Sequence, residues 1–298
     1  YIFIAEGVRG SLAKNIISNY NLAKNSDFPK FGIGIKEVWE VESGKHREGQ
    51  VVHTMGWPLG NSTGGGSFLY HGSDNQVYVG FVVHLNYKNP HLFPYKEFQR
   101  FKHHPFIYDL LKGGKRIEYG ARAISEGGVQ SVPKLSFPGG VLIGCSAGFV
   151  NVPRIKGNHN AILSGVAAPE AANLALSNGR SNDSLEEYEK KIVNGYVFKD
   201  LNPVKNVKPL WSRLGLFLGI ILGAIDMWCA NIIGKNLFGT LKHKYPDHSS
   251  LDLASKAKII NYPKADGKIS FERLESVSFS GTSRSEERRV GKECPLLC

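Results

Sequence analysis

The sequence lacks the markers of several common classes of protein. Its four cysteines show no paired spacing and no Cys-x-x-Cys, which is typical of free thiols in a reducing compartment and not of a disulfide framework. The GxGxxG fingerprint, which holds a dinucleotide pyrophosphate, occurs nowhere. No basic helix, zinc pattern or aromatic RNA-binding motif accompanies the net charge of +11, so we expect no nucleic-acid partner.

Apolar runs of membrane-spanning length are also missing. The run Leu214–Ile225 has twelve apolar or glycine residues, whereas a spanning helix needs about 20. In a spanning helix over Leu210–Leu237, Asp226 would lie near the bilayer centre at a cost of about 2.5–3.5 kcal/mol. We therefore expect a helix that lies in the membrane interface and enters one leaflet. A buried core helix is the alternative.

The groups around this run suit a lipid surface. The residues expected to contact the membrane are Trp211, Leu214, Leu218, Ile221 and Trp228. Basic residues on both sides would meet anionic head groups, each worth about 1 kcal/mol. They are Lys205, Lys208, Arg213, Lys235, Lys242 and Lys244. A ridge of small residues, Gly215, Gly219 and Gly223, allows another element to pack closely.

What the sequence does contain is typical of a globular α/β protein. Apolar residues make up 42% and charged residues 21% of 298 residues, enough for one large or two ordinary domains. Apolar periodicity predicts the strands and helices. The expected strands are Tyr1–Glu6, Phe31–Val41, Gln50–Met55 and Val77–Leu85. The expected helices are Gly10–Tyr20, Tyr95–Leu111 and Ser184–Ile192. The second of these should break at Pro105, and the third should begin with a capping box of Ser184 and Glu187.

The stretch Leu135–Gly165 organises the rest of the chain. A buried run, Val141–Ile143, is followed by a turn of small residues, Gly144–Gly148, and by a helix expected to begin near Gly157–Asn158. A strand, a tight turn and a helix N-terminus bring N–H groups and a positive dipole end to an anionic or electron-rich ligand. An ordinary buried strand and turn would give the same pattern. Pro169 is expected to kink the helix.

Several stretches carry a resemblance to a known family. They are AEGVRGSLAK (Ala5–Lys14), GWPL and GGSFLYH within Gly56–His71, GFVVHLNYKNP (Gly80–Pro90), EFQRFKHHP (Glu97–Pro105), the whole of Gly113–Gly157, and LKHKYPDHSSL (Leu241–Leu251). From Ile2 to Thr282 the chain resembles electron transfer flavoprotein–ubiquinone oxidoreductase, a membrane flavoenzyme of mitochondria and bacteria. The resemblance implies an enzyme that accepts electrons from reduced electron transfer flavoprotein and reduces ubiquinone to ubiquinol in the respiratory chain.

The resemblance also implies a mixed α/β fold, in which part of an FAD-binding Rossmann-like domain is interwoven with a ubiquinone-binding domain of sheet and helix. Its membrane association would be monotopic. Because Tyr1 falls in mid-strand, we expect a piece that begins inside the FAD domain; a complete protein that never had the fingerprint is the alternative. The expected parts are the FAD domain at 1–30 and 131–180, the ubiquinone domain at 31–130, its helical membrane-facing part at 181–258, the start of a linker to a ferredoxin-like domain at 259–283, and a non-native tail at 284–298.

One set of site residues implied by the resemblance binds the quinone. Gly65 and Gly66 are expected at the ubiquinone head group, where a backbone N–H donates to a quinone oxygen and no side chain fills the slot. Gly64 stands where the family has a tyrosine, which leaves one wall of the slot in question. An ordinary glycine turn in a hairpin is the alternative.

A second set, Gln130, Gly148 and Asn158, is expected to contact the FAD cofactor. The Gln130 amide would donate to the N5–C4 carbonyl edge of the flavin and tune its reduction; a turn glutamine bonded to backbone is the alternative. Asn158 would cap its helix and replace a threonine of the family.

The family's 4Fe-4S cluster is held by four cysteines, three of them closely spaced, in a ferredoxin-like domain. That set is absent here, so we expect no metal site in this chain. His103 and His104 point to different sides of a helix and are not expected to hold a metal. Without the pyrophosphate loop and the cluster, the piece itself should be inactive.

The resemblance places the parent enzyme at the matrix face of the mitochondrial inner membrane in a eukaryote. Its expected partners are electron transfer flavoprotein, ubiquinone and an anionic membrane surface. Two other functions stay open. One is a flavoprotein of the geranylgeranyl-reductase type acting on a long isoprenoid, against which the SFLYH and KHHP stretches argue. The other is a non-catalytic, peripheral membrane-binding module, which flavin absorbance would distinguish.

Overall fold

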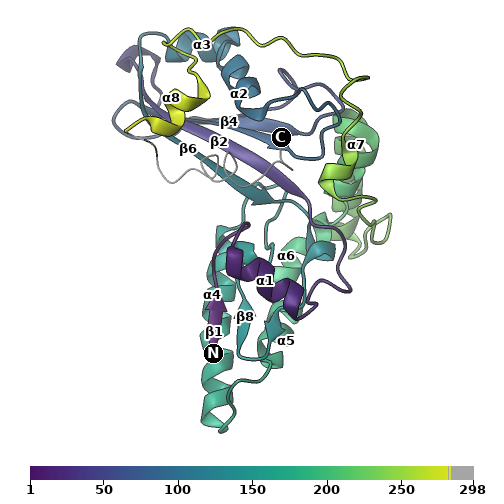
Figure 1. Cartoon of the computed structure of the whole chain (residues 1–298). Coiled ribbons are helices and arrows are strands. Elements are labelled where there is room, and N and C mark those ends of the chain that lie inside the picture. Colours follow the sequence, from purple (N-terminus) through teal and green to yellow (C-terminus); the bar gives the residue numbers. More distant parts are fainter. Residues whose placement is uncertain (281, 283–298) are drawn as a thin grey trace. The chain divides into compact units, whose positions relative to one another are not determined.

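The computed structural model describes residues 1–280 and 282. The chain divides into two compact units, each built from two separate stretches (Figure 1). Unit 1 comprises Tyr1–Phe31 and Ile124–Pro246, and unit 2 comprises Gly32–Ala123 and Asp247–Cys298. The fold is mixed α/β, as expected, because each unit contains both a sheet and helices.

Unit 2 is organised around a five-stranded sheet with the order β3-β4-β5-β2-β6. Its strands are β2 (Phe31–Glu40), β3 (Val51–Thr54), β4 (Gly65–His71), β5 (Gln76–His84) and β6 (Lys115–Ser125). The pairs β3–β4, β4–β5 and β5–β2 are antiparallel. The sequence predicted β2, β3 and β5 to within one residue at each end, but it predicted no strand where β4 and β6 lie.

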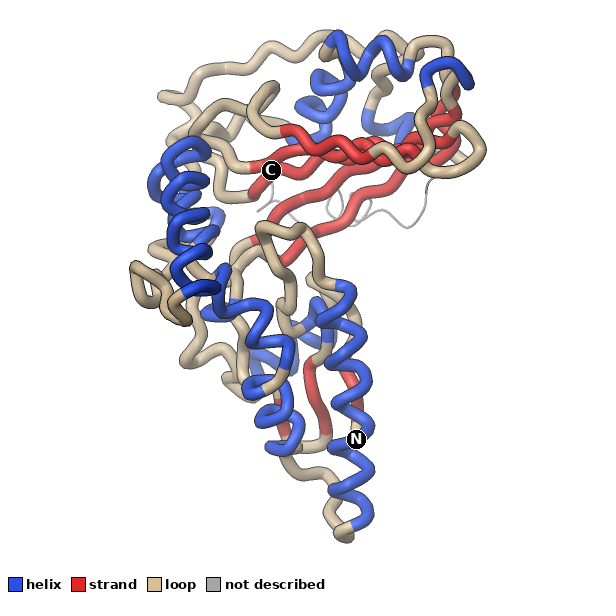
Figure 2. The backbone as a smooth tube through the Cα atoms, turned by 180° about the vertical axis from the view of Figure 1, so that it is seen from behind, coloured by secondary structure: helices blue, strands red, loops and turns tan. Residues whose placement is uncertain are grey.

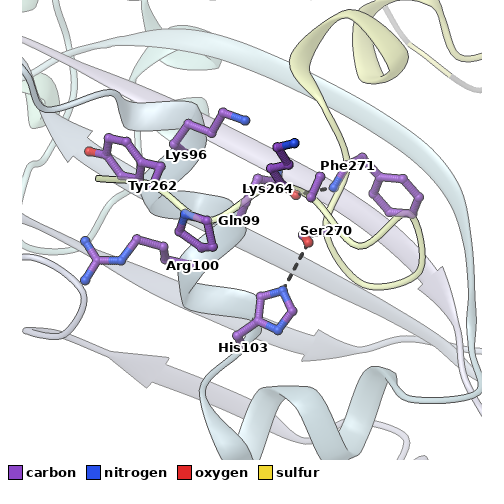
Figure 3. A pocket seen from close by; sticks show the side chains of 10 residues that line it. Lys96, Gln99, Arg100, His103, Tyr262, Lys264, Ser270 and Phe271 are labelled. Atoms are coloured by element: carbon purple, nitrogen blue, oxygen red, sulfur yellow. Dashed lines mark hydrogen bonds between the residues drawn. The ribbon is translucent and has the colours of Figure 1, made fainter. Parts of the chain in front are cut away.

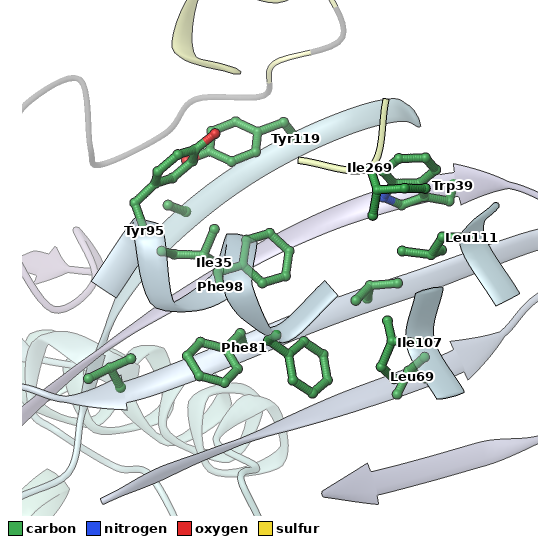
Figure 4. Packing of buried hydrophobic residues seen from close by; sticks show 14 of the residues in the cluster. Ile35, Trp39, Leu69, Phe81, Tyr95, Phe98, Ile107, Leu111, Tyr119 and Ile269 are labelled. Atoms are coloured by element: carbon green, nitrogen blue, oxygen red, sulfur yellow. The ribbon is translucent and has the colours of Figure 1, made fainter. Parts of the chain in front are cut away.

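Two short helices pack on this sheet: α2 (Pro94–Lys102) supplies buried aromatic side chains, and α3 (Pro105–Leu111) supplies buried aliphatic ones. The break between them lies at His103 and His104, so the break expected at Pro105 is confirmed. Figure 4 shows the Phe98 ring of α2 beside the Phe81 ring of β5. Their ring centroids are 6.3 Å apart, and Phe101 lies at 5.3 Å from Phe81 on the same cluster.

The last part of the described chain completes unit 2. It contains helix α8 (Arg273–Ser278) and places Ile269 inside the core of the five-stranded sheet. This stretch was expected to be the start of a linker, so its packing against the sheet is a finding of the structure. The tail expected at 284–298 lies outside the described residues.

Unit 1 contains a three-stranded sheet with the order β1-β8-β7. Its strands are β1 (Ile2–Ile4), β7 (Ser136–Phe137) and β8 (Gly140–Leu142), and β1 runs parallel to β8. Helix α1 (Ser11–Asn19) follows β1, and helix α4 (Asn158–Ser177) follows β8, as the sequence predicts (Figure 2). Small buried side chains let α4 pack closely on its core: Ala167, Ala168, Ala171, Ala172 and Ala175. The helix is assigned without interruption across Pro169.

Helices α5 (Glu186–Asn194) and α6 (Tyr196–Leu201) contact α4 and each other. Residues 181–246 therefore group with unit 1, whereas the predicted boundaries placed them with the ubiquinone domain. The capping box predicted at Ser184 and Glu187 is wrong, because α5 begins after Leu185 with no side-chain cap and Glu187 pairs with Arg180. Short 3-10 turns occur at Ser43–Lys45, Val129–Ser131, Gly144–Ser146, Asn202–Val204 and Asp247–Ser250.

The apolar run forms a helical hairpin and not one straight helix. Helix α7 (Val207–Ile232) is interrupted at Gly215, whose φ of 76° and ψ of −176° suit glycine alone. The two limbs fold back on each other, because a Cβ added at Gly219 would lie 2.8 Å from the Trp211 Cα and one at Gly223 would lie 3.8 Å from the Val207 Cα. The helix expected over this run is thus present as two limbs, and the close packing expected of its glycines is confirmed for Gly219 and Gly223.

Candidate functional site

The glycine run of unit 2 leads into the first residues of strand β4. Gly65 has a φ of 151°, and a Cβ there would overlap the Val82 carbonyl oxygen of the neighbouring strand. A Cβ at Gly66 would lie 2.7 Å from the Thr54 carbonyl oxygen. The close approach of β3 and β5 on either side of β4 therefore requires glycine at both positions.

The strand pairing decides which of these glycines can donate to a ligand. His84 donates its backbone N–H to the Gly64 carbonyl at 3.0 Å, and these residues stand opposite each other in the ladder. Because antiparallel N–H groups alternate in direction, Gly66 also faces β5, whereas the Gly65 N–H faces the opposite edge. On that edge β3 has ended at Thr54, whose partner is Ser67. The Gly65 N–H therefore points to the side of β4 where β3 has already ended, whereas the Gly66 N–H points to β5.

Apolar and aromatic groups surround this point. Leu59 is buried, and its Cδ1 would lie 2.6 Å from a Cβ at Gly65. The His84 ring packs directly on the Gly64 Cα, so the imidazole takes up space that a larger side chain at 64 would need. Trp57 is half exposed and its ring lies 5.4 Å from that of His104. The loop before β4 therefore offers flat apolar surface beside a backbone donor.

In unit 1 the loops that follow β1 and β8 meet at the same edge of the three-stranded sheet. Ser146 Oγ donates to the Gly7 carbonyl at 3.2 Å, and the Gly144 N–H donates to Ser164 Oγ of α4 at 3.0 Å. Gly144 and Gly148 have positive φ angles of 56° and 86°, respectively. The carboxyl ends of parallel strands are where open α/β sheets bind ligands, and here they carry a cradle of small residues.

The N-terminus of α4 opens onto this cradle. No side chain caps it, so the cap expected from Asn158 is not made, and Asn158 is exposed. Asn160 turns inward instead and donates to the Asp200 carboxylate at 3.1 Å, while its buried Oδ1 has no hydrogen-bond partner among the described residues. By contrast, the Glu6 carboxylate occupies the start of α1, where it accepts the Ala13 N–H at 2.8 Å. Of these two helix starts, α4 is the one left open for an electron-rich ligand.

Gln130 serves a packing role in the structure. Its Nε2 donates to the carbonyls of Lys205 at 2.8 Å and Leu241 at 3.0 Å, which matches the backbone-bonded alternative. Its buried Oε1 has no partner among the described residues. The flavin contact predicted for Gln130 stays a prediction, and it would use the oxygen and not the nitrogen of the amide.

Sequence reasoning missed a buried ion pair beside this glutamine. The Lys208 Nζ donates to the Glu126 carboxylate, and both side chains are almost fully buried. Burial raises the pKa of Glu126, although the Lys208 ammonium opposes this shift. Lys208 is thus unavailable to lipid head groups, and the expectation that it contacts the membrane is wrong. Only packing between distant segments revealed this pair.

Asp226 is likewise buried by protein, with 1% of its surface exposed. Its carboxylate accepts hydrogen bonds from the Asn206 and Asn236 amides at 3.0 and 2.7 Å and from the Phe238 N–H at 3.0 Å. The cost assigned to an unsatisfied charge in lipid therefore does not apply to Asp226, because this carboxylate is satisfied within unit 1.

The outer face of the helical hairpin is apolar. Four of the five predicted membrane contacts, Leu214, Leu218, Ile221 and Trp228, are 38–70% exposed, whereas Trp211 packs on Gly219. By length and composition, Tyr196–Ile232 qualifies as a membrane-spanning helix. The break at Gly215 leaves a second limb of about 17 residues, roughly 26 Å long, which is shorter than the hydrocarbon core of about 30 Å.

The described residues do not fit an iron–sulfur cluster. They contain no group of three or more His, Cys, Asp or Glu side chains placed to hold a metal ion. Cys145 and Cys229 are free thiols, and burial raises the pKa of Cys145. His103 forms a hydrogen bond with Ser270 Oγ at 3.1 Å, and His104 stacks near Trp57, so neither histidine faces a shared ligand site.

Sequence comparison gives these features a context. Residues 31–124 match the family described as the ubiquinone-binding domain of electron transfer flavoprotein–ubiquinone oxidoreductase. The chain is 45% identical over 291 residues to the electron transfer flavoprotein-ubiquinone oxidoreductase of Pseudomonas aeruginosa, covering 97% of this chain and 52% of that protein. It is 47% identical to the mitochondrial enzyme of Rattus norvegicus, covering 95% and 47%. The resemblance inferred from the motifs is thus confirmed, and the relatives are oxidoreductases.

The chain spans about half the length of the curated relatives it matches. Among solved structures, a geranylgeranyl bacteriochlorophyll reductase-like protein from Thermoplasma acidophilum aligns with a TM-score of 0.47 at 18% identity, over 71% of this chain and 54% of that one. A similarity at this level carries no argument about function.

Proposed function

We propose that this chain, related over almost its whole length to the electron transfer flavoprotein–ubiquinone oxidoreductases, is the ubiquinone-binding part of such an enzyme together with part of its FAD domain. The whole enzyme would take electrons from reduced electron transfer flavoprotein and deliver them to ubiquinone. The match of residues 31–124 to the ubiquinone-binding domain carries the proposal. The constrained glycines of β4 lie within that match.

In this proposal the quinone head group lies at the start of β4. The Gly65 N–H donates to a quinone oxygen from the side of β4 that faces away from β5. Leu59 and the neighbouring loop keep water from this oxygen, which strengthens the hydrogen bond. Gly66 serves a different purpose, because its N–H is directed at β5 and its missing Cβ lets β3 approach.

FAD, when bound, supplies the one-electron and two-electron redox chemistry. The residues present fit its ring at the open start of α4, where the helix that begins at Asn158 has no side-chain cap and the nearby Gly144 and Gly148 bring no side chains. The positive end of the helix dipole would favour negative charge there. The pair of His159 and Asp200, with their atoms 3.0 Å apart, holds the first turn of α4 in place.

We further propose that the helical hairpin attaches the protein to a membrane surface without crossing it. In a eukaryote this surface would be the matrix face of the mitochondrial inner membrane, as the mitochondrial relatives support. The limb length and the exposed aliphatic face favour a hairpin that enters one leaflet. Replacing Leu218 and Ile221 by Asp should abolish flotation of the chain with liposomes containing anionic lipid. The matched control replaces two exposed residues outside unit 1, Val51 and Leu274, by Asp and should float normally.

Photoaffinity labelling tests the quinone site directly. A ubiquinone analogue with a photoreactive group on its ring should label the stretch 55–66 of the full chain, and excess unlabelled ubiquinone should abolish the label. Label confined to other peptides, or label that ubiquinone does not compete away, would contradict the assignment. This measurement needs neither flavin nor electron transfer activity, so it applies even to a piece that is itself inactive.

Flavin absorbance after purification separates the remaining alternatives. A yellow protein would support a flavoprotein piece that retains its cofactor. A colourless protein that floats with liposomes would favour the non-catalytic membrane-binding module. The geranylgeranyl-reductase alternative gains no support, because the sequence identity of 45–47% is to ubiquinone oxidoreductases.

A further inference from the structure

Unit 2 contains a pocket that the quinone proposal does not use. It lies between helix α2 and the chain stretch 262–271 (Figure 3). One wall comes from the EFQRFKHHP stretch and the other from the segment that follows Tyr262. The polar residues that line it are Lys96, Gln99, Arg100, His103, Tyr262, Lys264 and Ser270.

The charged groups that line this pocket are all cationic. Lys96, Arg100 and Lys264 contribute to the lining, and no carboxylate does so among the described residues. Glu272 and Glu97, which pair with Lys96 and Arg100 at 2.6 and 3.0 Å, lie outside the lining. Cations in the lining of a concave site raise the local concentration of anions, and the two ion pairs of Lys96 and Arg100 reduce this effect.

A buried hydrogen-bond donor lies in the same wall. Gln99 is 5% exposed, and its Oε1 accepts the Phe271 N–H at 2.9 Å. That bond fixes the orientation of the amide, because a flipped group would set its NH₂ against the Phe271 N–H. Gln99 Nε2 then has no hydrogen-bond partner among the described residues. A buried donor without an acceptor is unfavourable, and a bound acceptor would remove that cost.

We propose that this pocket binds a small oxyanion, a phosphate or carboxylate group, which accepts a hydrogen bond from Gln99 Nε2 and lies among the Lys96, Arg100 and Lys264 cations. The inference does not depend on the proposed quinone chemistry, because none of these residues belongs to the glycine site of β4. Arg100 suits the role, since only its NH1 is engaged by Glu97 and its other N–H groups have no partner in the described chain.

Binding would connect two stretches that are far apart in the sequence. Gln99 and Arg100 lie on α2, whereas Lys264 and Phe271 lie on the C-terminal segment. An oxyanion held by both walls therefore stabilises the docking of residues 262–271 on α2. Its binding should slow hydrogen exchange at the Phe271 amide, which donates to Gln99.

Titration of the full chain with inorganic phosphate tests the site. At constant ionic strength, maintained with chloride, phosphate should raise the melting temperature in a saturable way and protect residues 262–271 from hydrogen exchange. A parallel titration with malonate distinguishes the sources, because tighter phosphate binding assigns the site to phosphate groups and tighter malonate binding assigns it to carboxylates. If neither anion gives saturable binding, the proposal is overturned.

Two variants locate the binding. Gln99→Glu keeps the acceptor for the Phe271 N–H but replaces the donor by a negative oxygen, and it should weaken binding by at least about tenfold. Lys264→Gln should weaken binding about threefold to tenfold, whereas Lys268→Gln, an equally exposed lysine outside the lining, should leave it unchanged. An equal loss in both lysine variants would show non-specific attraction and refute the site. This pair decides the question even if Gln99→Glu disturbs folding.

Discussion

At the scale of single residues, the fold of unit 2 depends on positions that admit one residue type. Gly65 is the clearest case, because its positive φ and its contact with the Val82 carbonyl leave no space for a Cβ. The same constraint directs its N–H away from β5. A residue that the fold requires thus also provides the donor proposed for the quinone.

A Gly65→Ala substitution should destabilise the protein by about 1–3 kcal/mol and weaken ubiquinone binding, because the Cβ forces β4 away from β5. Urea unfolding and the photoaffinity experiment measure the two effects. Gly60→Ala is the control, since no atom lies within 4 Å of a Cβ there, and it should be neutral or slightly stabilising. Equal effects of the two substitutions would show that β4 tolerates a side chain at residue 65.

Lys102 provides a prediction about pH. It is fully buried against Glu37 at 2.8 Å, and burial lowers its pKa from 10.5 to about 8 although the Glu37 carboxylate opposes this shift. Between pH 8 and 10.5 the unfolded chain therefore binds one more proton at this lysine than the folded chain does. The free energy of unfolding of the wild type, relative to Lys102→Met, should rise with pH in this window, by at most about 1.4 kcal/mol per pH unit. A difference that is flat or falls with pH would show that Lys102 keeps its ordinary pKa when folded.

At the scale of elements, one glycine divides the apolar run into the two limbs of the helical hairpin. Gly215 reverses the chain, and Gly219 and Gly223 then face Trp211 and Val207 of the first limb. The buried Asp226 carboxylate ties the base of the hairpin to residues 236–238. The result is a hairpin with an apolar outer face and a satisfied Asp226 carboxylate at its base.

The two glycines of the second limb should respond differently to alanine. Helix propensity alone favours alanine by about 1 kcal/mol at both positions. Gly223→Ala should gain part of this, because its Cβ would make ordinary contacts at 3.7–3.9 Å. Gly219→Ala should instead lower the free energy of unfolding by about 1–3 kcal/mol, since its Cβ would lie 2.8 Å from the Trp211 Cα. Circular dichroism during urea unfolding measures both changes, and stabilisation by Gly219→Ala would refute the hairpin.

At the scale of the whole molecule, the chain leaves and re-enters each unit. Unit 2 is completed by residues after 246, which cover a buried charge cluster of Glu37, Lys102 and Arg116. Phe271 packs over the Arg116 guanidinium at 3.7 Å and over the Lys102 ammonium at 5.1 Å. These contacts join segments that more than 150 residues separate, so unit 2 depends on its C-terminal segment.

A Phe271→Ala substitution should therefore destabilise unit 2 by about 3–5 kcal/mol, because it opens a cavity over buried charges and removes two cation–π contacts. Leu274→Ala is the matched control on the same segment, since Leu274 is 72% exposed, and it should change stability by less than about 0.5 kcal/mol. Hydrogen exchange of β2 and β6 measures the effect. A Phe271→Ala protein with wild-type protection would show that the segment does not support the sheet.

The sequence by itself determined the features that depend on neighbouring residues. Strands β1, β2 and β5, helix α1, the start of α4 and the break before Pro105 all follow from local periodicity and from the missing N–H of proline. The family resemblance also rests on contiguous stretches, so it too was available from the sequence. The predicted glycines Gly65 and Gly66 lie where close strand approach requires glycine.

Only the tertiary structure decided which groups a side chain contacts when those groups are distant in the sequence. Gln130 bonds to carbonyls 75 and 111 residues away, and Lys208 pairs with a carboxylate 82 residues earlier. The Asp226 carboxylate accepts hydrogen bonds from amides that precede and follow its helix. Local patterns report which residues prefer burial, but not which buried charges meet, because such pairs form only when separate segments pack together.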